Sequence, residues 1–322
     1  MTLRTERTHT ESKETNDAER AWWNENAELI SRVWEMHPEV SWGSRAGYLR
    51  RAKRFFLRGR QEASVLELGC GSGWVGQFIA GPELRIVGTD QSESQISLAV
   101  ANAAARGLDA FCRYSVVDTV KLPCDMKAAD GVLIHAFMHH LDGGEVAGLL
   151  DDLAGSLLAG TRLWFYEPAF YRSAPESSSR GAAPPFGLRQ ATWLVQRLSS
   201  FYRSRKLLDE STMEQFNALM KQASESGWYV SPKEVPFVVE DFSAALERRF
   251  RVAQSYWATV NQVGWAYETN LIADPQWRKL ASSTVVPLLR LADENLARDE
   301  GYLRAIMVAP NYAFRVWECE LS

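Results

Sequence analysis

Three features that would narrow the class of this protein at once are missing from its sequence: a basic excess, paired cysteines and a long apolar run. Its 322 residues hold 36 lysines and arginines against 40 aspartates and glutamates, for a formal net charge of -4. Because binding to phosphate backbones needs a basic surface, we expect no nucleic acid partner. No run approaches the roughly 18 apolar residues of a membrane span, and the polar N-terminus is unlike a signal peptide.

The four cysteines, Cys70, Cys112, Cys124 and Cys319, are scattered and form no CxxC pair. They are typical of reduced thiols in a cytoplasmic protein, not of a disulfide or zinc framework. Because no ligand cluster stands at metal spacing, we also expect no metal. With 46% apolar and 24% charged residues, the composition is that of a globular protein with a sizeable core. The sequence therefore predicts a cytoplasmic protein of one large domain, or of one domain and a cap.

What the sequence does contain is a glycine-rich turn after a short apolar run. Residues 65–73 read VLELGCGSG, and Thr89-Asp90 ends a second apolar run 17 residues after Gly73. A strand, a turn with alternating glycines and a helix are typical of the first unit of a nucleotide-binding α/β fold. Glycine permits the sharp turn and lets the backbone approach a ligand, which a Cβ would obstruct.

Apolar strands and helical patterns then alternate along the chain. We expect strands at 64–68, 85–89, 110–116, 130–134 and 161–166, with helices at 73–80, 92–106 and 145–158 between them. Such alternation predicts right-handed crossovers and a doubly wound, mostly parallel sheet covered on both faces. Further expected elements are helices at 17–36, 44–58 and 277–299 and a final strand at 312–319.

These patterns divide the chain into five parts. Residues 1–15 have no periodicity and are expected to be a disordered tail. A helical cap at 16–60 precedes the cofactor-binding core at 61–171, an inserted helical cap follows at 172–240, and 241–322 complete the sheet with a long helix. Most of the 12 tryptophans lie outside the core. They either attach the peripheral helices to it or line an apolar pocket.

The glycine pattern alone leaves the ligand open. Gly71, Gly73 and Gly76 match GxGxxG, which also occurs in nicotinamide and flavin dinucleotide sites. Two carboxylates favour another ligand. Glu67, at the end of the first strand, would oppose a pyrophosphate at this turn and would favour a cation. Asp118, after the third strand, could accept a hydrogen bond from the amine of an adenine.

Together these segments resemble the class I S-adenosylmethionine (SAM) dependent methyltransferases of the small-molecule type. Residues 64–73 are similar to the family's first motif, and Asp90 to its ribose-binding acid. Asp118 is similar to its adenine-contacting acid, and residues 134–141, which end in His-His-Leu, to its fourth-strand segment. The resemblance covers about residues 60–170 and the last strand. It implies an α/β fold with a seven-stranded Rossmann-like sheet, an antiparallel last strand and a helical cap.

The same resemblance implies SAM as the cofactor and S-adenosylhomocysteine as its product. Glu67 would polarise the methionine end of SAM, Asp90 would bind the ribose hydroxyls, and His135 would lie beside the sulfonium. The full set of implied cofactor contacts is Glu67, Gly69, Gly71, Gly73, Asp90, Gln91, Ser92, Asp118, Thr119 and His135. An alternative role for Asp90 is to cap the helix that Ser92 begins.

Candidate bases follow the fourth and fifth strands, because open α/β sheets place ligands at the carboxyl ends of their strands. His139 and His140 follow the fourth strand, and Glu167 ends the fifth. A histidine suits proton removal near neutral pH. Each of the three also has a structural interpretation, as the histidines could cap a turn and Glu167 could bind backbone amides or an arginine. The expected acceptor contacts are Trp22, Trp23, Tyr166 and Tyr171.

Methyl transfer from a sulfonium is an in-line displacement, which needs alignment, exclusion of water and a base where the acceptor loses a proton. The aromatic helices outside the core favour an acceptor that is a small, largely hydrophobic metabolite, such as a natural product of secondary metabolism, methylated at oxygen or carbon. Two alternatives remain: an NAD(P)-dependent oxidoreductase, and a methyltransferase-like protein that binds SAM without catalysis. The tryptophan-rich helices could serve a homodimer interface as well as a lid.

Overall fold

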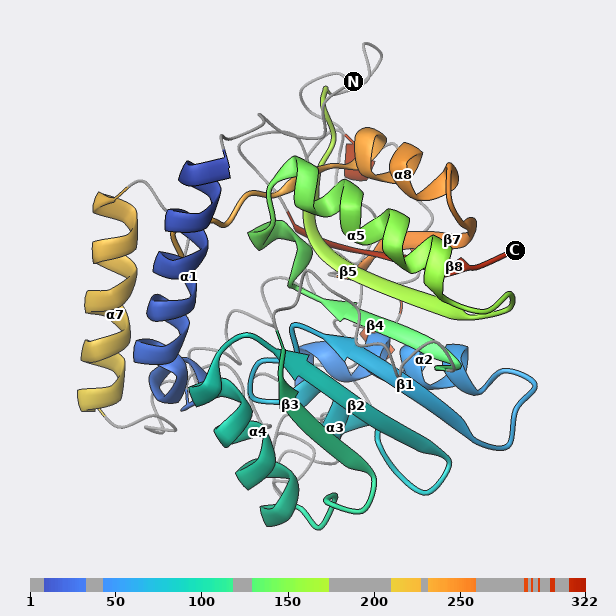
Figure 1. The fold of residues 1–322 in the computed structure, drawn as a ribbon, viewed down its shortest axis with the longest axis horizontal. Coiled ribbons are helices and arrows are strands. Elements are labelled where there is room, and N and C mark those ends of the chain that lie inside the picture. The colour runs from blue at the N-terminus through green and yellow to red at the C-terminus, as the bar shows by residue number, and fades with distance from the viewer. Residues whose placement is uncertain are drawn as a thin grey trace.

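The alternating pattern forms one sheet of eight strands, shown in Figure 1. The computed structural model gives their bounds as β1 (Ala63–Leu68), β2 (Leu84–Asp90), β3 (Cys112–Val116), β4 (Gly131–His135), β5 (Arg162–Phe170), β6 (Phe237–Val238), β7 (Arg251–Trp257) and β8 (Ala313–Glu320). The order is β3-β2-β1-β4-β5-β8-β7, with β6 beside β5. β1 to β5 pair in parallel, and β8 is antiparallel to β5 and β7. The predicted Rossmann-like sheet with an antiparallel last strand is confirmed.

The structure describes residues 9–32, 43–117, 129–173, 210–226, 231–258 and 313–322, together with 287, 288, 291, 295 and 302–304. The long helix expected at 277–299 lies almost wholly outside these residues. Asp118 and Thr119, two implied adenine contacts, also lie outside them.

Helices cover both faces of the sheet. Side chains of α2 (Gly43–Leu57), α3 (Trp74–Ile79) and α4 (Glu93–Ala105) pack with β1, β2, β4, β5 and β8 in one apolar core. Those of α5 (Gly143–Ser156) and α8 (Val239–Glu247) pack on the opposite face. Every residue of β4 is buried, as expected for a central strand covered on both sides.

Caps fix where two helices begin at the cavity end of the sheet. Ser92 caps α4 by accepting a hydrogen bond from the backbone N–H of Gln95. Asp142 and Glu145 form a capping box at the start of α5, each side chain accepting from the other's backbone N–H. These starts place the first turns of α4 and α5 next to the carboxyl ends of β2 and β4.

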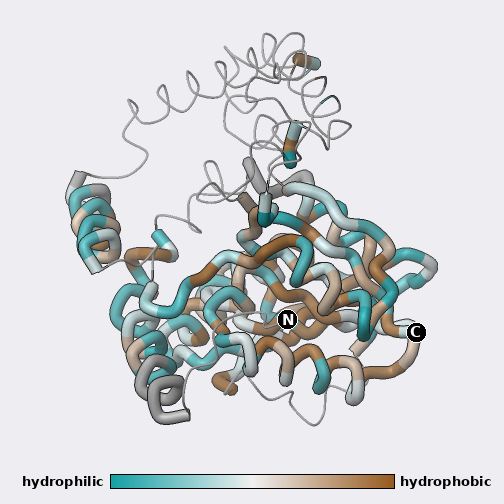
Figure 2. The backbone as a smooth tube through the Cα atoms, turned by 90° about the horizontal axis from the view of Figure 1, so that it is seen from above, coloured by the Kyte–Doolittle hydropathy of each residue, from teal (hydrophilic) through white to brown (hydrophobic). Residues whose placement is uncertain are grey.

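Two helices lie outside these layers. α1 (His9–Ile30) and α7 (Glu210–Glu225) run side by side, and α1 also contacts α4 (Figure 1). In Figure 2 the hydrophobic segments concentrate in the central strands, whereas α7, at the far left, is largely hydrophilic. None of the described helices is long and apolar enough to cross a membrane.

Two expected boundaries are corrected by the structure. Residues 9–15, expected in a disordered tail, form the first turns of α1. A helix nucleated by packed turns extends into polar sequence at low cost, so missing periodicity does not end it. Residues 237–238, expected in the inserted cap, form β6 and pair with β5, which continues to Phe170 beyond its predicted end.

Candidate functional site

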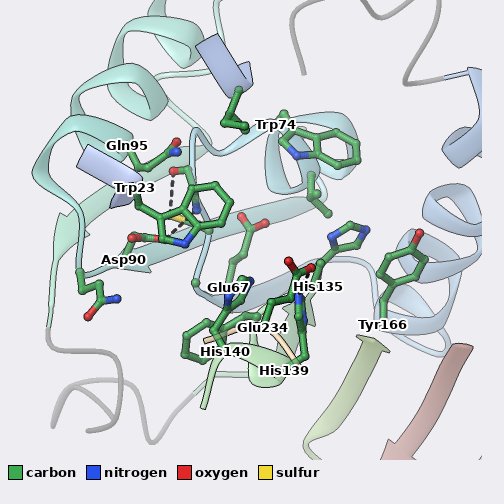
Figure 3. Close-up of a pocket in the computed structure, with 18 of the residues that line it drawn as sticks. Trp23, Glu67, Trp74, Asp90, Gln95, His135, His139, His140, Tyr166 and Glu234 are labelled. Carbon is green, nitrogen blue, oxygen red and sulfur yellow. Dashed lines mark hydrogen bonds and ion pairs between the residues drawn. The ribbon is translucent and has the colours of Figure 1, made fainter. Parts of the chain in front are cut away.

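A cavity of about 430 Å³ lies at the carboxyl ends of β1, β2 and β4, under α1 (Figure 3). Many residues expected at the site line it together: Trp23, Glu67, Gly69, Gly71, Asp90, Gln91, His135, His139, His140 and Tyr166. Expected residues that do not line it, although the structure describes them, are Trp22, Gly73, Ser92, Glu167 and Tyr171. Residues that line it and were not expected from the sequence include Glu19, Trp74, Gln95, Glu234 and Phe314.

The glycines of the turn serve backbone geometry and packing. Gly69, Gly71 and Gly73 all have positive φ, at 64°, 53° and 76°. A Cβ on Gly69 would lie 2.4 Å from the ring of Phe137, and one on Gly73 would lie 2.7 Å from the ring of Tyr114. At both positions the protein's own aromatic rings fill the space that a Cβ would need, and the approach of this backbone to a ligand stays a prediction.

Glu67 presents a buried carboxylate at the floor of the cavity. Its side chain accepts a hydrogen bond from the backbone N–H of Gly76 at 3.3 Å. A Cβ on Gly76 would lie 2.3 Å from Glu67 Oε2, so the third glycine of the GxGxxG pattern makes room for this carboxylate. A negative charge at this position disfavours the pyrophosphate of a dinucleotide.

Asp90 ties the glycine turn to the start of α4. Its two carboxylate oxygens accept hydrogen bonds from the backbone N–H groups of Gly71 and Ser92, each at 2.9 Å. Burial raises the pKa of Asp90. The two hydrogen bonds lower it, but burial is the larger effect. Each oxygen keeps a further lone pair for a hydroxyl of a ligand. Asp90 thus holds the turn and faces the cavity, whereas Ser92 is the helix cap and not a lining residue.

Glu167 holds the turn that carries the two histidines, η4 (Met138–His140). Its fully buried carboxylate accepts hydrogen bonds from the backbone N–H groups of Phe137 at 3.0 Å and Met138 at 2.8 Å. It also lies 2.7 Å from Nδ1 of His139. The structural interpretation of Glu167 is the one observed. The side chain does not line the cavity. Its carboxylate oxygens instead bind the backbone N–H groups of the turn and the ring of His139.

His139 is held between two carboxylates. Its Nδ1 contacts Glu167, and its Nε2 lies 3.1 Å from Oε1 of Glu234. Burial opposes a charge on the ring, but the hydrogen bonds to Glu167 and Glu234 outweigh it and raise the pKa of His139 to about 9. The same contact lowers the pKa of Glu234, although burial raises it. Both ring nitrogens of His139 are thus engaged with carboxylates, and its predicted role as a base stays a prediction.

His140 has a different environment from its neighbour. Its Nδ1 lies 2.9 Å from Oε1 of Glu19, on α1, and its ring meets Trp23 edge to face at 5.6 Å between centroids. Among the residues that the structure describes, none forms a hydrogen bond with Nε2 of His140. Of the three candidate bases, His139 and His140 line the cavity, and His140 is the one with a ring nitrogen outside the hydrogen bonds of the described residues.

An aromatic wall closes the cavity at β4 and β5. The rings of His135 and Tyr166 stack at 4.0 Å between centroids, and Tyr166 stacks on Phe314 at 4.6 Å. Tyr48 lies 3.0 Å from Nε2 of His135 through its hydroxyl oxygen, and Trp74 meets the same ring edge to face. This wall offers a mainly aromatic surface that includes the imidazole ring of His135.

Two expected acceptor contacts lie elsewhere. Tyr171 is buried, accepts a hydrogen bond from Arg315 at 2.9 Å and packs against Trp257, so it belongs to the sheet core. Trp22 packs edge to face on Trp23 but does not line the cavity. Neighbours in sequence on a helix point about 100° apart, so the two tryptophans have different surroundings.

Two carboxylates that line the cavity, Glu19 and Glu234, were not expected from the sequence. They differ in whether a local sequence pattern could have predicted their position. Glu19 stands four residues before Trp23 on a predicted helix, and residues at this spacing share a helix face. Glu234 lies between Pro232 and Pro236 in a segment without periodicity, so no local signal places it beside His139. Among the described residues, no group of three or more His, Cys, Asp or Glu side chains is arranged to hold a metal ion.

Comparisons with known proteins identify the core and the fold. Residues 65–160 match the family model of a methyltransferase domain. No curated protein matches the chain. The solved [4+2]-cyclase SpnF is similar over 93% of this chain and 94% of its own, with a TM-score of 0.52 and 15% identity. Phosphoethanolamine N-methyltransferase 2 of Haemonchus contortus, in complex with SAM, is similar over 95% of this chain and 59% of its own, with a TM-score of 0.53 and 13% identity. At such identities the likeness shows the fold and not the reaction.

Proposed function

We propose that the protein transfers a methyl group from SAM to a small, largely hydrophobic acceptor, because residues 65–160 match the family model of a methyltransferase domain and lie in a Rossmann-like sheet. The observation that carries the proposal is the charge of the cavity. Four carboxylates line it, and none of its described lining residues is a lysine or an arginine: the four are Glu19, Glu67, Asp90 and Glu234. Such a lining favours a cationic ligand and disfavours a pyrophosphate.

The residues at the turn fit SAM. Glu67 presents its charge at the floor, where a sulfonium and an amino group are favoured over an anion. Asp90 has lone pairs directed at the cavity for two ribose hydroxyls, and Gly71 brings the backbone to the lining. Bound SAM supplies an electrophilic methyl group on sulfur.

His140 is the base in this proposal. As an acceptor hydroxyl or carbon acid reacts, its O–H or C–H bond breaks and the proton goes to Nε2 of His140. The electron pair of that bond forms the new bond to the methyl carbon, and the pair of the broken S–C bond stays on sulfur. Proton removal by a positioned side chain contributes about 10²–10⁴-fold to rate. α1, which lies across the cavity, excludes water.

The lining also limits the acceptor. Tyr166, Phe314 and Trp74 supply apolar surface, and carboxylates line the same cavity. A phosphate or carboxylate on the acceptor would be buried with these carboxylates, and the ring of His139 is already paired with Glu167 and Glu234. We therefore favour an uncharged acceptor, methylated at oxygen or carbon.

Calorimetry with S-adenosylhomocysteine, SAM, NADH and NADPH tests the cofactor. We expect the two SAM-type ligands to bind and the nicotinamides not to bind. Glu67→Gln should weaken SAM binding by about 10–100-fold, the effect of losing one charge-assisted hydrogen bond. Glu62→Gln, at an exposed carboxylate outside the cavity, is the matched control and should leave affinity unchanged. Binding of a nicotinamide without S-adenosylhomocysteine would favour the oxidoreductase alternative.

A mass-spectrometric screen tests the reaction. Purified protein and SAM are incubated with panels of uncharged and phosphorylated hydrophobic metabolites, and products are searched for the gain of one methyl group. We expect gains in the uncharged panel that His140→Ala abolishes while binding of S-adenosylhomocysteine remains. Binding without methyl transfer to any compound would favour the non-catalytic alternative.

A further inference from the structure

Glu19 brings a carboxylate from α1 to the candidate base. Its side chain is 2% exposed. Oε1 accepts hydrogen bonds from Ser231 Oγ at 2.7 Å and Trp23 Nε1 at 2.8 Å, and lies 2.9 Å from Nδ1 of His140. Oε2 accepts from the backbone N–H of Lys233 at 3.0 Å. A carboxylate with this many donors has a fixed position and orientation.

The charge of Glu19 determines which nitrogen of His140 carries the proton. Burial raises the pKa of Glu19, but its hydrogen bonds to His140, Ser231 and Trp23 outweigh burial and lower it. Glu19 is therefore ionised and can only accept at His140. An acceptor at Nδ1 holds the proton of the neutral ring there, which leaves Nε2 with a free lone pair.

Besides the contacts of Glu19, polar side chains attach α1 to the N-termini of α5 and α4. Near its start, Asn16 donates to Oε1 of Glu145 on α5 at 2.9 Å and accepts from Nζ of Lys233, which also donates to Oε2 of Glu145 at 2.7 Å. Further along, Asn24 accepts from the hydroxyl of Ser92 at 2.7 Å, at the N-terminus of α4. Between these attachments, the face of α1 with Glu19 and Trp23 lies over the cavity.

We propose that Glu19 is the positioning residue for the base, delivered by α1 acting as a lid. With α1 seated on α4 and α5, Glu19 holds His140 with its proton on Nδ1 and presents Nε2 to the acceptor. Any movement of α1 that opens the cavity withdraws Glu19, so the base is complete only when the ligands are enclosed. This inference rests on the proposed methyl transfer.

Histidine NMR tests the inference directly. The chain has five histidines, so ¹⁵N-histidine labelling resolves the tautomer of each ring, and His140→Gln assigns the signal. In Glu19→Ala, Ser231 loses its acceptor and turns its proton to Nδ1 of His140, 3.2 Å away. We therefore expect the ring to change from the Nδ1–H to the Nε2–H tautomer. In Glu19→Gln, the amide oxygen still accepts from Nδ1 and the tautomer should remain.

Two further variants separate positioning from support of the fold. Glu19→Met fills the space without an acceptor and should change the tautomer as Glu19→Ala does, even where the alanine variant does not fold. Glu28→Gln, at an exposed carboxylate of α1 that pairs with Arg32 and not with His140, is the control, and the Nδ1–H form should persist. With an acceptor found in the screen, kcat of the alanine and methionine variants should fall about 10²-fold, with KM for SAM within about twofold of wild type.

The inference is overturned if His140 keeps its Nδ1–H form in both Glu19→Ala and Glu19→Met, or if Glu28→Gln changes it equally. Calorimetry with S-adenosylhomocysteine on the wild-type protein keeps the two proposals apart. Wild-type protein that does not bind S-adenosylhomocysteine contradicts the proposed function, whatever the tautomer. Binding together with an unchanged tautomer contradicts only the role of Glu19.

Discussion

Different kinds of contact stabilise the two ends of the cavity, the glycine turn and the histidine turn. At the glycine turn, Glu67 and Asp90 are fixed by backbone N–H groups that lie 2 to 19 residues away in sequence. At the histidine turn, His139 and His140 are fixed by carboxylates of three segments far from them in the chain. The first end depends on backbone geometry and the second on paired buried charges. Substitutions should therefore damage the first through strain and the second through unpaired charge.

The largest effect is expected from Glu167→Ala. It leaves the N–H groups of Phe137 and Met138 and the charge on His139 without their buried acceptor. Removing one partner of a buried ion pair costs about 3–5 kcal/mol of unfolding free energy. Urea denaturation measures it, with Glu214→Ala, an exposed carboxylate on α7, as the control that should change stability by less than about 0.5 kcal/mol. Equal losses in both variants would contradict the charge-paired description of this end.

A pH dependence of similar size should follow from His139. Its pKa is raised to about 9 in the folded protein, from about 6.5 in the unfolded chain. The stabilisation is then complete below about pH 6.5 and lost as pH rises through 9, at most about 3 kcal/mol. Denaturation at several pH values should show this fall in the wild type and a flatter profile in His139→Gln. Parallel profiles would mean that the ring is not charged in the folded state.

The contrast between the two ends also explains what the sequence could predict. Strand and turn patterns are local, so the parallel strands followed from the alternation along residues 64–166, and the glycine turn and its two acids followed from residues 64–90. His139 and His140 are adjacent, and nothing near them distinguishes a ring clamped by Glu167 and Glu234 from one that faces the cavity. That distinction depends on tertiary packing of β5, residue 234 and α1. The sequence could therefore propose three bases but could not choose among them.

Glycine substitutions measure strain at the first end. Gly73 and Gly107 both have positive φ, but a Cβ on Gly73 would meet the ring of Tyr114, whereas one on Gly107 has nothing within 4 Å. Alanine at Gly107 should cost about 1 kcal/mol for the left-handed backbone alone. Alanine at Gly73 should cost about 2 kcal/mol more, because the ring must move. Thermal or urea denaturation of the two variants gives the difference, and equal costs would show that Tyr114 yields without strain.

The smallest expected effect concerns Ser92, and it tests whether this residue contacts the cofactor or only caps α4. The resemblance implied a cofactor contact, but the hydroxyl of Ser92 accepts from Gln95 N–H at 3.2 Å and donates to Asn24 on α1. As a helix cap it should cost about 1 kcal/mol when replaced by alanine. Affinity for S-adenosylhomocysteine should stay within about twofold in Ser92→Ala, as in the neighbouring control Ser94→Ala. A tenfold loss of affinity for S-adenosylhomocysteine in Ser92→Ala, and not in Ser94→Ala, would show that Ser92 contacts the ligand. One hydroxyl would then both cap the helix and bind the cofactor.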